Sequence, residues 1–210
     1  MEFGAVDFRF CPRCATALAV RSIAGDGDPL ERLACPAANC GYVHWGNPTP
    51  AVGAIVEHEG EIILARNAGW PPGFFALVTG YLEAREDPLR AVAREVKEEL
   101  DLDVVETNLV GNYIFERKNE IMLCYHVVAT GAVKLGAELA EYRRYKPAEL
   151  RPWKRATGLA VADWMRSRGK LGGQHKVPRM DNSGQITAEM SRFFAGAEQA
   201  RFLAQLKSTS

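Results

Sequence analysis

The stretch Gly80-Tyr-Leu-Glu-Ala-Arg-Glu-Asp-Pro-Leu-Arg-Ala-Val-Ala-Arg-Glu-Val-Lys-Glu-Glu-Leu-Asp-Leu102 decides which fold we expect. It begins with a glycine at the end of a short apolar run and continues into a predicted helix. Asp87 can cap that helix, and Pro88 suits its first position. Apolar residues then recur at spacings of three and four, which indicates one buried helical stripe: Leu89, Val92, Val96 and Leu100.

Three glutamates form an acidic cluster on the same helix. Glu95, Glu98 and Glu99 stand at i, i+3 and i+4, so we expect their carboxylates on one face, opposite the apolar stripe. Like charges at this spacing repel, and Arg90 and Lys97 balance them only in part. Taken alone the cluster also fits a solvated helix face, so its meaning depends on the surrounding residues.

The surrounding residues resemble the Nudix box, G-x5-E-x7-R-E-U-x-E-E-x-G-U. The matching positions are Gly80, Glu86, Arg94, Glu95, Val96, Glu98, Glu99 and Leu102. Asp101 replaces the second glycine, at a helix end where a left-handed backbone is often required and aspartate is better tolerated than most residues. The resemblance implies an α/β fold, namely an α/β/α sandwich with a mixed β-sheet.

The same resemblance implies a catalytic set of Glu95, Glu98 and Glu99 that binds magnesium or manganese. Glu95 and Glu99 would be metal ligands, Glu98 a ligand or the base that activates water, and the carbonyl of Gly80 a further ligand. Hard divalent cations prefer such oxygen donors, and magnesium shares its waters with substrate phosphates.

Two further residues of the box have an expected structural part. Arg94 lies four residues before Glu98 and can also reach Glu86, so we interpret Arg94 and Glu86 as holding the loop in shape.

The water-activating acid of many Nudix proteins lies on a later loop instead. Four glutamates are candidates here: Glu116, Glu120, Glu138 and Glu141. We favour Glu138 and Glu141, because they precede a short predicted strand at 142–145, where relatives often place an acidic residue.

Four of the five cysteines stand in the first fifth of the chain. Cys11-Pro-Arg-Cys14 and Cys35-Pro-Ala-Ala-Asn-Cys40 form C-x2-C and C-x4-C pairs with twenty residues between them. This spacing favours metal over disulfides and resembles the two knuckles of a zinc ribbon. With four thiolates the zinc would have no open position for water, so we predict a structural site.

The chain divides by composition into three predicted parts: a zinc ribbon at 1–46, a Nudix domain at 47–168 and a helical extension at 169–210. The stiff sequence Asn47-Pro-Thr-Pro50 marks the first boundary. Within the second part we expect strands at 51–58, 61–66, 76–81, 104–115, 121–130 and 142–145, and a helix at 157–167. The extension carries a helical pattern at 187–206, whose apolar residues suggest docking on the core or in a homodimer.

Charge and hydropathy restrict the partners. The 26 basic and 26 acidic residues cancel, so no general positive field attracts nucleic acid or a membrane. The first ten residues do not form a secretory signal, and no segment is long and apolar enough to span a membrane. We therefore expect a cytoplasmic protein with a small nucleotide substrate.

A zinc ribbon followed by a Nudix domain is similar to NADH, ADP-ribose and FAD pyrophosphatases over residues 8–165. The resemblance implies hydrolysis of a pyrophosphate bond with release of a nucleoside monophosphate. The S-Q-P-W-P-F-P-x-S signature of the NADH enzymes is absent, which favours ADP-ribose or flavin dinucleotides. Two alternatives stay open: a capped RNA end or damaged triphosphate as substrate, and a nucleotide-sensing module whose ribbon contacts nucleic acid or protein.

Overall fold

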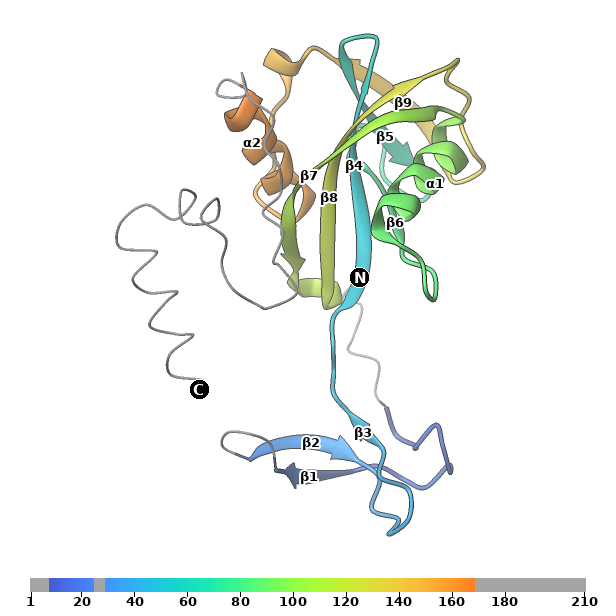
Figure 1. Cartoon of the computed structure of the whole chain (residues 1–210), viewed down its shortest axis with the longest axis vertical. Coiled ribbons are helices and arrows are strands. Elements are labelled where there is room, and N and C mark those ends of the chain that lie inside the picture. Colours follow the sequence, from blue (N-terminus) through green and yellow to red (C-terminus); the bar gives the residue numbers. More distant parts are fainter. Residues whose placement is uncertain (1–7, 25–28, 169–210) are drawn as a thin grey trace, which may run out of the picture. The chain divides into compact units, whose positions relative to one another are not determined.

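The computed structural model describes residues 8–24 and 29–168 (Figure 1). The strands are β1 Ala19–Ile23, β2 Leu30–Ala34, β3 Val43–His44, β4 Thr49–His58, β5 Glu61–Asn67, β6 Val78–Tyr81, β7 Asp103–Phe115, β8 Glu120–Thr130 and β9 Leu139–Tyr145. The α-helices are α1 Pro88–Leu100 and α2 Thr157–Arg168, and short 3-10 turns cover Glu116–Lys118 and Pro147–Glu149. The predicted extension at 169–210, with its helix at 187–206, lies outside the described residues.

The larger sheet is mixed. Its strands run in the order β7-β8-β4-β5-β9, and β6 pairs with the half of β4 that β5 leaves open. β4 and β8 are parallel over their whole paired length, whereas the other pairs are antiparallel. Residues 51–56 of β4 are all buried, as expected of a central strand that is covered on both faces.

The two helices supply those covers, one on each face of the sheet (Figure 1). Val92 and Val96 of α1 pack with Val52 of β4, and on the other face Val161 and Trp164 of α2 pack with Ile55. The predicted α/β/α sandwich with a mixed sheet is confirmed.

Helix α1 begins and ends where the sequence predicts. The Asp87 side chain accepts a hydrogen bond from the Leu89 N–H at 2.8 Å, and Pro88 takes the first position. Asp101 ends the helix with a left-handed backbone, φ 55° and ψ 25°. The buried stripe differs from the predicted stripe at one position. Leu89 is exposed, and the buried stripe begins with Ala91 and Val92.

The predicted strands of 47–168 agree with the structure to within two residues at each end, apart from the start of β9. Ala76 forms only an isolated bridge to Ala65, so β6 begins at Val78. Strand β9 begins at Leu139 because it pairs with the whole of β5, which the sequence alone does not indicate.

The N-terminal cysteines lie around a separate, small antiparallel sheet in the order β1-β2-β3. Strand β1 is exposed along nearly its whole length, and the buried residues of this part include Cys11, Ala34 and Cys35. So small an apolar core stabilises a fold only with help from another source. No helix among the residues that the structure describes is both long and apolar enough to cross a membrane.

Candidate functional site

The candidate site begins where β6 meets α1. Antiparallel pairing with β4 places Gly80 opposite Val52, which faces α1. The Glu95 carboxylate lies so close to Gly80 that a Cβ atom there would overlap it. A side chain at position 80 would therefore displace the Glu95 carboxylate, and the backbone φ of Gly80 is not in the left-handed region.

Burial separates the three glutamates of α1. The Glu95 side chain is 12% exposed and Glu99 is half-buried, whereas the Glu98 side chain is 58% exposed. The expectation that all three lie opposite the apolar stripe is therefore wrong for two of them. Glu95 and Glu99 each precede a buried stripe residue, Val96 or Leu100, and flank the stripe.

Burial and neighbouring carboxylates disfavour ionisation of this pair. Burial raises the pKa of Glu99 to about 8, and the charges of Glu95, Glu138 and Glu98 contribute to the rise. The pKa of Glu95 is also raised, chiefly by burial, against the opposing effect of Arg94. Among residues 8–24 and 29–168, no side chain donates a hydrogen bond or forms an ion pair to the Glu99 carboxylate. A cation would fit this arrangement, because it would compensate the buried negative charge.

Arg94 connects the box loop to the helix. Its Nε and Nη2 donate to Glu86 at 2.7 and 3.0 Å, and its Nη1 donates to Glu95 at 2.7 Å and to Glu98 at 2.9 Å. Nη2 also donates to the backbone carbonyl of Tyr81 at 3.1 Å. The hydrogen bonds from Arg94 are the main cause that lowers the pKa of Glu86 to about 2. The two contacts predicted for Arg94, with Glu86 and with Glu98, are present.

Glu138 and Glu141 have different surroundings. Glu138 is exposed, and its charge contributes to the raised pKa values of Glu95 and Glu99. Glu141 accepts a hydrogen bond from Arg66 Nε at 2.6 Å, and that arginine also donates to the Trp70 carbonyl at 3.0 Å. Of these two glutamates, Glu138 is thus the one whose charge acts on the acidic cluster.

The two less favoured glutamates do not join the cluster. Glu116 is exposed in a 3-10 turn. Glu120 is buried and accepts a hydrogen bond from the Tyr81 hydroxyl at 2.5 Å, an interaction that raises the pKa of Tyr81 to about 12. Sequence reasoning did not find the Tyr81–Glu120 pair, since its members are 39 positions apart and match no motif.

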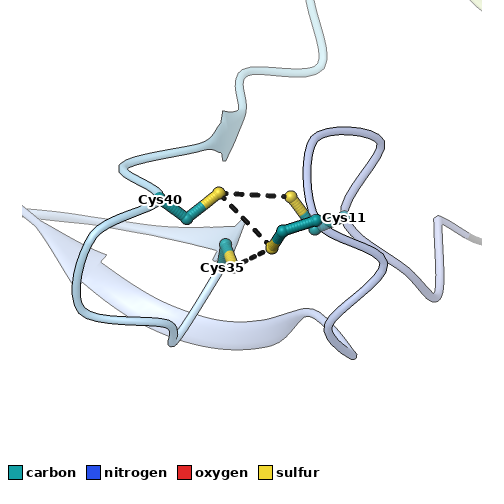
Figure 2. A group of neighbouring side chains, drawn as sticks. Cys11, Cys35 and Cys40 are labelled. Carbon is teal, nitrogen blue, oxygen red and sulfur yellow. Dashed lines mark hydrogen bonds between the residues drawn. The ribbon is translucent and has the colours of Figure 1, made fainter.

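The four N-terminal cysteines converge on one point (Figure 2). Their sulfur atoms all lie within 4.8 Å of one another, and three pairs of them are 3.5 Å apart. The predicted residues are Cys11, Cys14, Cys35 and Cys40, and all are free thiols. A zinc–sulfur bond of about 2.3 Å in a tetrahedron requires sulfur separations of about 3.8 Å, so the donor set fits zinc. The hydrogen bond between Cys14 and the Thr16 side chain is the main cause that lowers the pKa of Cys14 to about 6, whereas the pKa values of Cys35 and Cys40 are raised.

Comparison with protein families assigns the class. The family model for the NUDIX domain matches residues 47–165, more than half of the chain. The chain therefore belongs to the Nudix hydrolase family, as its box predicts.

Particular relatives were found both by sequence and by structure. The NAD-capped RNA hydrolase NudC of Stutzerimonas stutzeri is 30% identical over 123 residues, which cover 59% of this chain and 42% of that protein. NudC of Chromobacterium violaceum is 32% identical over 117 residues, covering 56% and 41%. The matches thus span only about two fifths of these relatives. A solved NUDIX hydrolase from Nitrosomonas europaea superposes with a TM-score of 0.64 at 26% identity, covering 78% of this chain and 93% of that chain.

Proposed function

We propose that the chain is a metal-dependent pyrophosphohydrolase, which cleaves the pyrophosphate bond of a dinucleotide and releases a nucleoside monophosphate. The observation that carries the proposal is the pair of flanking carboxylates, Glu95 and Glu99, of which Glu95 lies against Gly80. Glu99 is half-buried and has no cationic partner among the described residues. A divalent cation supplies the charge that such a pair lacks.

The proposed ligand set is oxygen-rich, as magnesium and manganese prefer. Glu95 has one oxygen engaged by Arg94, which leaves the other for a metal, and Glu99 has both. Glu98 and the Gly80 carbonyl complete the proposed set. A bound metal would supply positive charge to the phosphate oxygens as the phosphorus–oxygen bond breaks. Arg94 and Glu86 hold the loop in this proposal and do not touch substrate.

We propose Glu138 in preference to Glu141 as the loop acid that accepts a proton from the attacking water. Arg66 Nε donates to Glu141 at 2.6 Å, so this carboxylate is held in an ion pair. Glu138 is exposed, and its charge acts on the carboxylates of Glu95 and Glu99. An exposed carboxylate beside the proposed metal ligands suits a general base that takes a proton from water.

Two observations on substrate class point in different directions. The relatives found by sequence are NAD-capped RNA hydrolases, which favours an NAD-type dinucleotide, free or linked to RNA. The missing proline- and tryptophan-rich signature favours ADP-ribose or FAD. We place the NAD-type dinucleotide first because it is supported by relatives that match 56 to 59% of this chain, and we keep the other two in the test.

The remaining parts of the proposal concern the rest of the chain. We propose that residues 1–46 form a ribbon held by structural zinc, that 47–168 form the hydrolase domain, and that 169–210 are an extension. A cytoplasmic location and a homodimer stay predictions from the sequence.

The test is release of nucleoside monophosphate from NAD, NADH, ADP-ribose, FAD, NAD-capped RNA and nucleoside triphosphates. Each substrate is assayed with magnesium, with manganese and with chelator. Metal-dependent hydrolysis of one dinucleotide class is the expected result. No turnover on any substrate by folded protein would contradict the enzyme proposal and favour the nucleotide-sensing alternative.

Glu98→Gln provides the matched variant for that assay. We expect kcat to fall by a factor on the order of 100 or more with substrate binding retained, since the change removes a charge and keeps the shape. Glu149→Gln, an exposed glutamate in the second 3-10 turn, is the control and should hydrolyse like the wild type. Unchanged turnover in Glu98→Gln would remove Glu98 from the catalytic set.

A further inference from the structure

The segment at 131–136, here called the docking segment, lies between β8 and β9 and contacts the C-terminal end of α1. The Lys134 N–H donates to the Leu100 carbonyl at 2.9 Å, and the Gly136 N–H donates to the Glu99 carbonyl at 2.9 Å. The last carbonyls of a helix have no partner within it, so these two bonds satisfy groups that otherwise need water or a cap. The docking segment is therefore a cap for α1 that comes from a distant part of the chain.

Gly136 allows this contact. A Cβ atom at Gly136 would overlap the carbonyl oxygen of Glu98 and would lie 3.3 Å from the Glu99 Cα. These neighbours are backbone atoms of a helix and cannot turn away as a flexible side chain would. Any side chain at position 136 must consequently move the docking segment away from α1.

Both ends of the segment are also held. At its start, His58 Nε2 lies 2.9 Å from the Gly131 carbonyl, and the imidazole is buried at the end of β4. Past its end, the Leu139 N–H donates to the Gly136 carbonyl at 3.2 Å, and the Glu138 carbonyl accepts from the Ala68 N–H at 2.8 Å. The backbone at Glu138 is thus fixed on one side by α1 and on the other by the residue that follows β5.

We propose that Gly136 is a positioning residue, which sets the place of the Glu138 carboxylate relative to Glu95 and Glu99 by docking the 131–136 segment on α1. The inference rests on the proposed function, in which Glu138 is the loop acid. Glu138 is two residues beyond the glycine, so a displacement of the backbone at 136 passes directly to it. Gly136 itself touches neither substrate nor metal in this arrangement.

Docking can be measured without metal or substrate, by amide hydrogen exchange in the full-length protein with chelator present. The amides of Lys134 and Gly136 should be protected in the wild type, and Gly136→Ala should lose protection at positions 134 and 136 by a factor on the order of 10 or more. The control is Gly60→Ala in the β4–β5 turn, where the left-handed φ of +78° strains an alanine but no atom lies within 4 Å of the added Cβ. It should leave protection at positions 134 and 136 unchanged. Equal protection in Gly136→Ala and wild type would overturn the proposal.

Kinetics test whether docking acts through Glu138. We expect Gly136→Ala to lower kcat by a factor on the order of 10 to 100, because a displacement of about 1 Å in a catalytic group costs that much, and to leave KM within about twofold. In a Glu138→Gln background, Gly136→Ala should lower kcat by less than about twofold, since the displaced side chain no longer accepts a proton. Full loss in both backgrounds would show that Gly136 acts by another route.

Two safeguards keep these outcomes separate. If Gly136→Ala does not fold, His58→Leu releases only the start of the segment and should show the same dependence on Glu138 with a smaller loss. A wild type with no turnover would contradict the proposed function, whereas an active wild type with an equally active Gly136→Ala would contradict this inference alone.

Discussion

Glu138 and Glu141 lie three positions apart, and their electrostatic surroundings predict opposite sensitivities. We expect Glu138→Gln to lower kcat by a factor on the order of 100 at neutral pH, because no other described carboxylate outside α1 perturbs the acidic cluster. Glu141→Gln should cost less than about fivefold, since it removes only the partner of Arg66. Steady-state kinetics of both variants on one dinucleotide measure the difference. A larger loss in Glu141→Gln than in Glu138→Gln would exchange their roles.

The raised pKa of Glu99, about 8, predicts how stability depends on pH when metal is absent. Between about pH 5 and about pH 8 the folded protein keeps a proton on Glu99 that the unfolded chain has released. The folded state therefore binds more protons than the unfolded chain. The contribution of Glu99 to the free energy of unfolding consequently falls as pH rises through this range. Divalent metal should oppose the fall, because it binds the ionised carboxylate.

Melting temperatures across that pH range, with chelator and with magnesium, provide the measurement. Glu99→Gln is the matched control. Its melting temperature should decline less as pH rises, and magnesium should no longer reverse that part of the decline. Identical pH profiles for wild type and Glu99→Gln in chelator would show that burial does not perturb this carboxylate.

Single positions of the candidate site differ in how well the sequence predicts them. The contacts of Arg94 with Glu86 and Glu98 follow from spacing along one loop and helix, and the structure has both. The burial of Glu99 does not follow from the helix alone, because it depends on the residues that pack beside the stripe. The Tyr81–Glu120 pair joins two strands of the sheet and leaves no local signal in the sequence.

The end of α1 carries a departure from the Nudix box, and its backbone predicts the effect of reversing it. Asp101 has φ 55°, a conformation that disfavours branched side chains and suits glycine. Its carboxylate is 3.0 Å from Lys97 Nζ, but both side chains are about half exposed, so this ion pair contributes little. Asp101→Gly should therefore raise the free energy of unfolding by up to about 1 kcal/mol.

Asp101→Val is the contrasting variant at the same position. Its branched side chain should lower the free energy of unfolding by about 1 to 2 kcal/mol, since it cannot adopt the left-handed backbone without strain. Urea unfolding of the two variants and the wild type gives the order. A less stable Asp101→Gly would mean that the Lys97 pair outweighs the backbone strain.

Helices and strands were predictable to the extent that their signals are local. The cap at Asp87, the proline at 88 and the spacing of Val92, Val96 and Leu100 place α1 without any knowledge of the sheet. Two apolar runs separated by turn residues likewise place β4 and β5 as a hairpin. The parallel pairing of β4 with β8, and the docking segment on α1, depend on contacts far apart in sequence, which no window of residues encodes.

Across the whole chain, the small apolar content of the N-terminal sheet predicts that its folding depends on metal. Strand β1 is mostly exposed and β2 has one buried residue, whereas the six-stranded sheet is enclosed by two helices. We expect about one zinc ion per chain, and removal of it should expose the amides of 19–23 and 30–34 to exchange while those of α1 stay protected. Cys35→Ser, which removes a buried ligand, should lose the zinc and show the same pattern of amide exchange. Cys124→Ser is the control, because Cys124 is a buried thiol of the larger core. Elemental analysis and amide exchange measure both effects.

Because a ligand set of four thiolates leaves no position for water, dinucleotide hydrolysis per folded Nudix domain should fall less than about threefold in the zinc-free protein. A loss as large as that of Glu98→Gln would instead mean that the ribbon takes part in substrate binding.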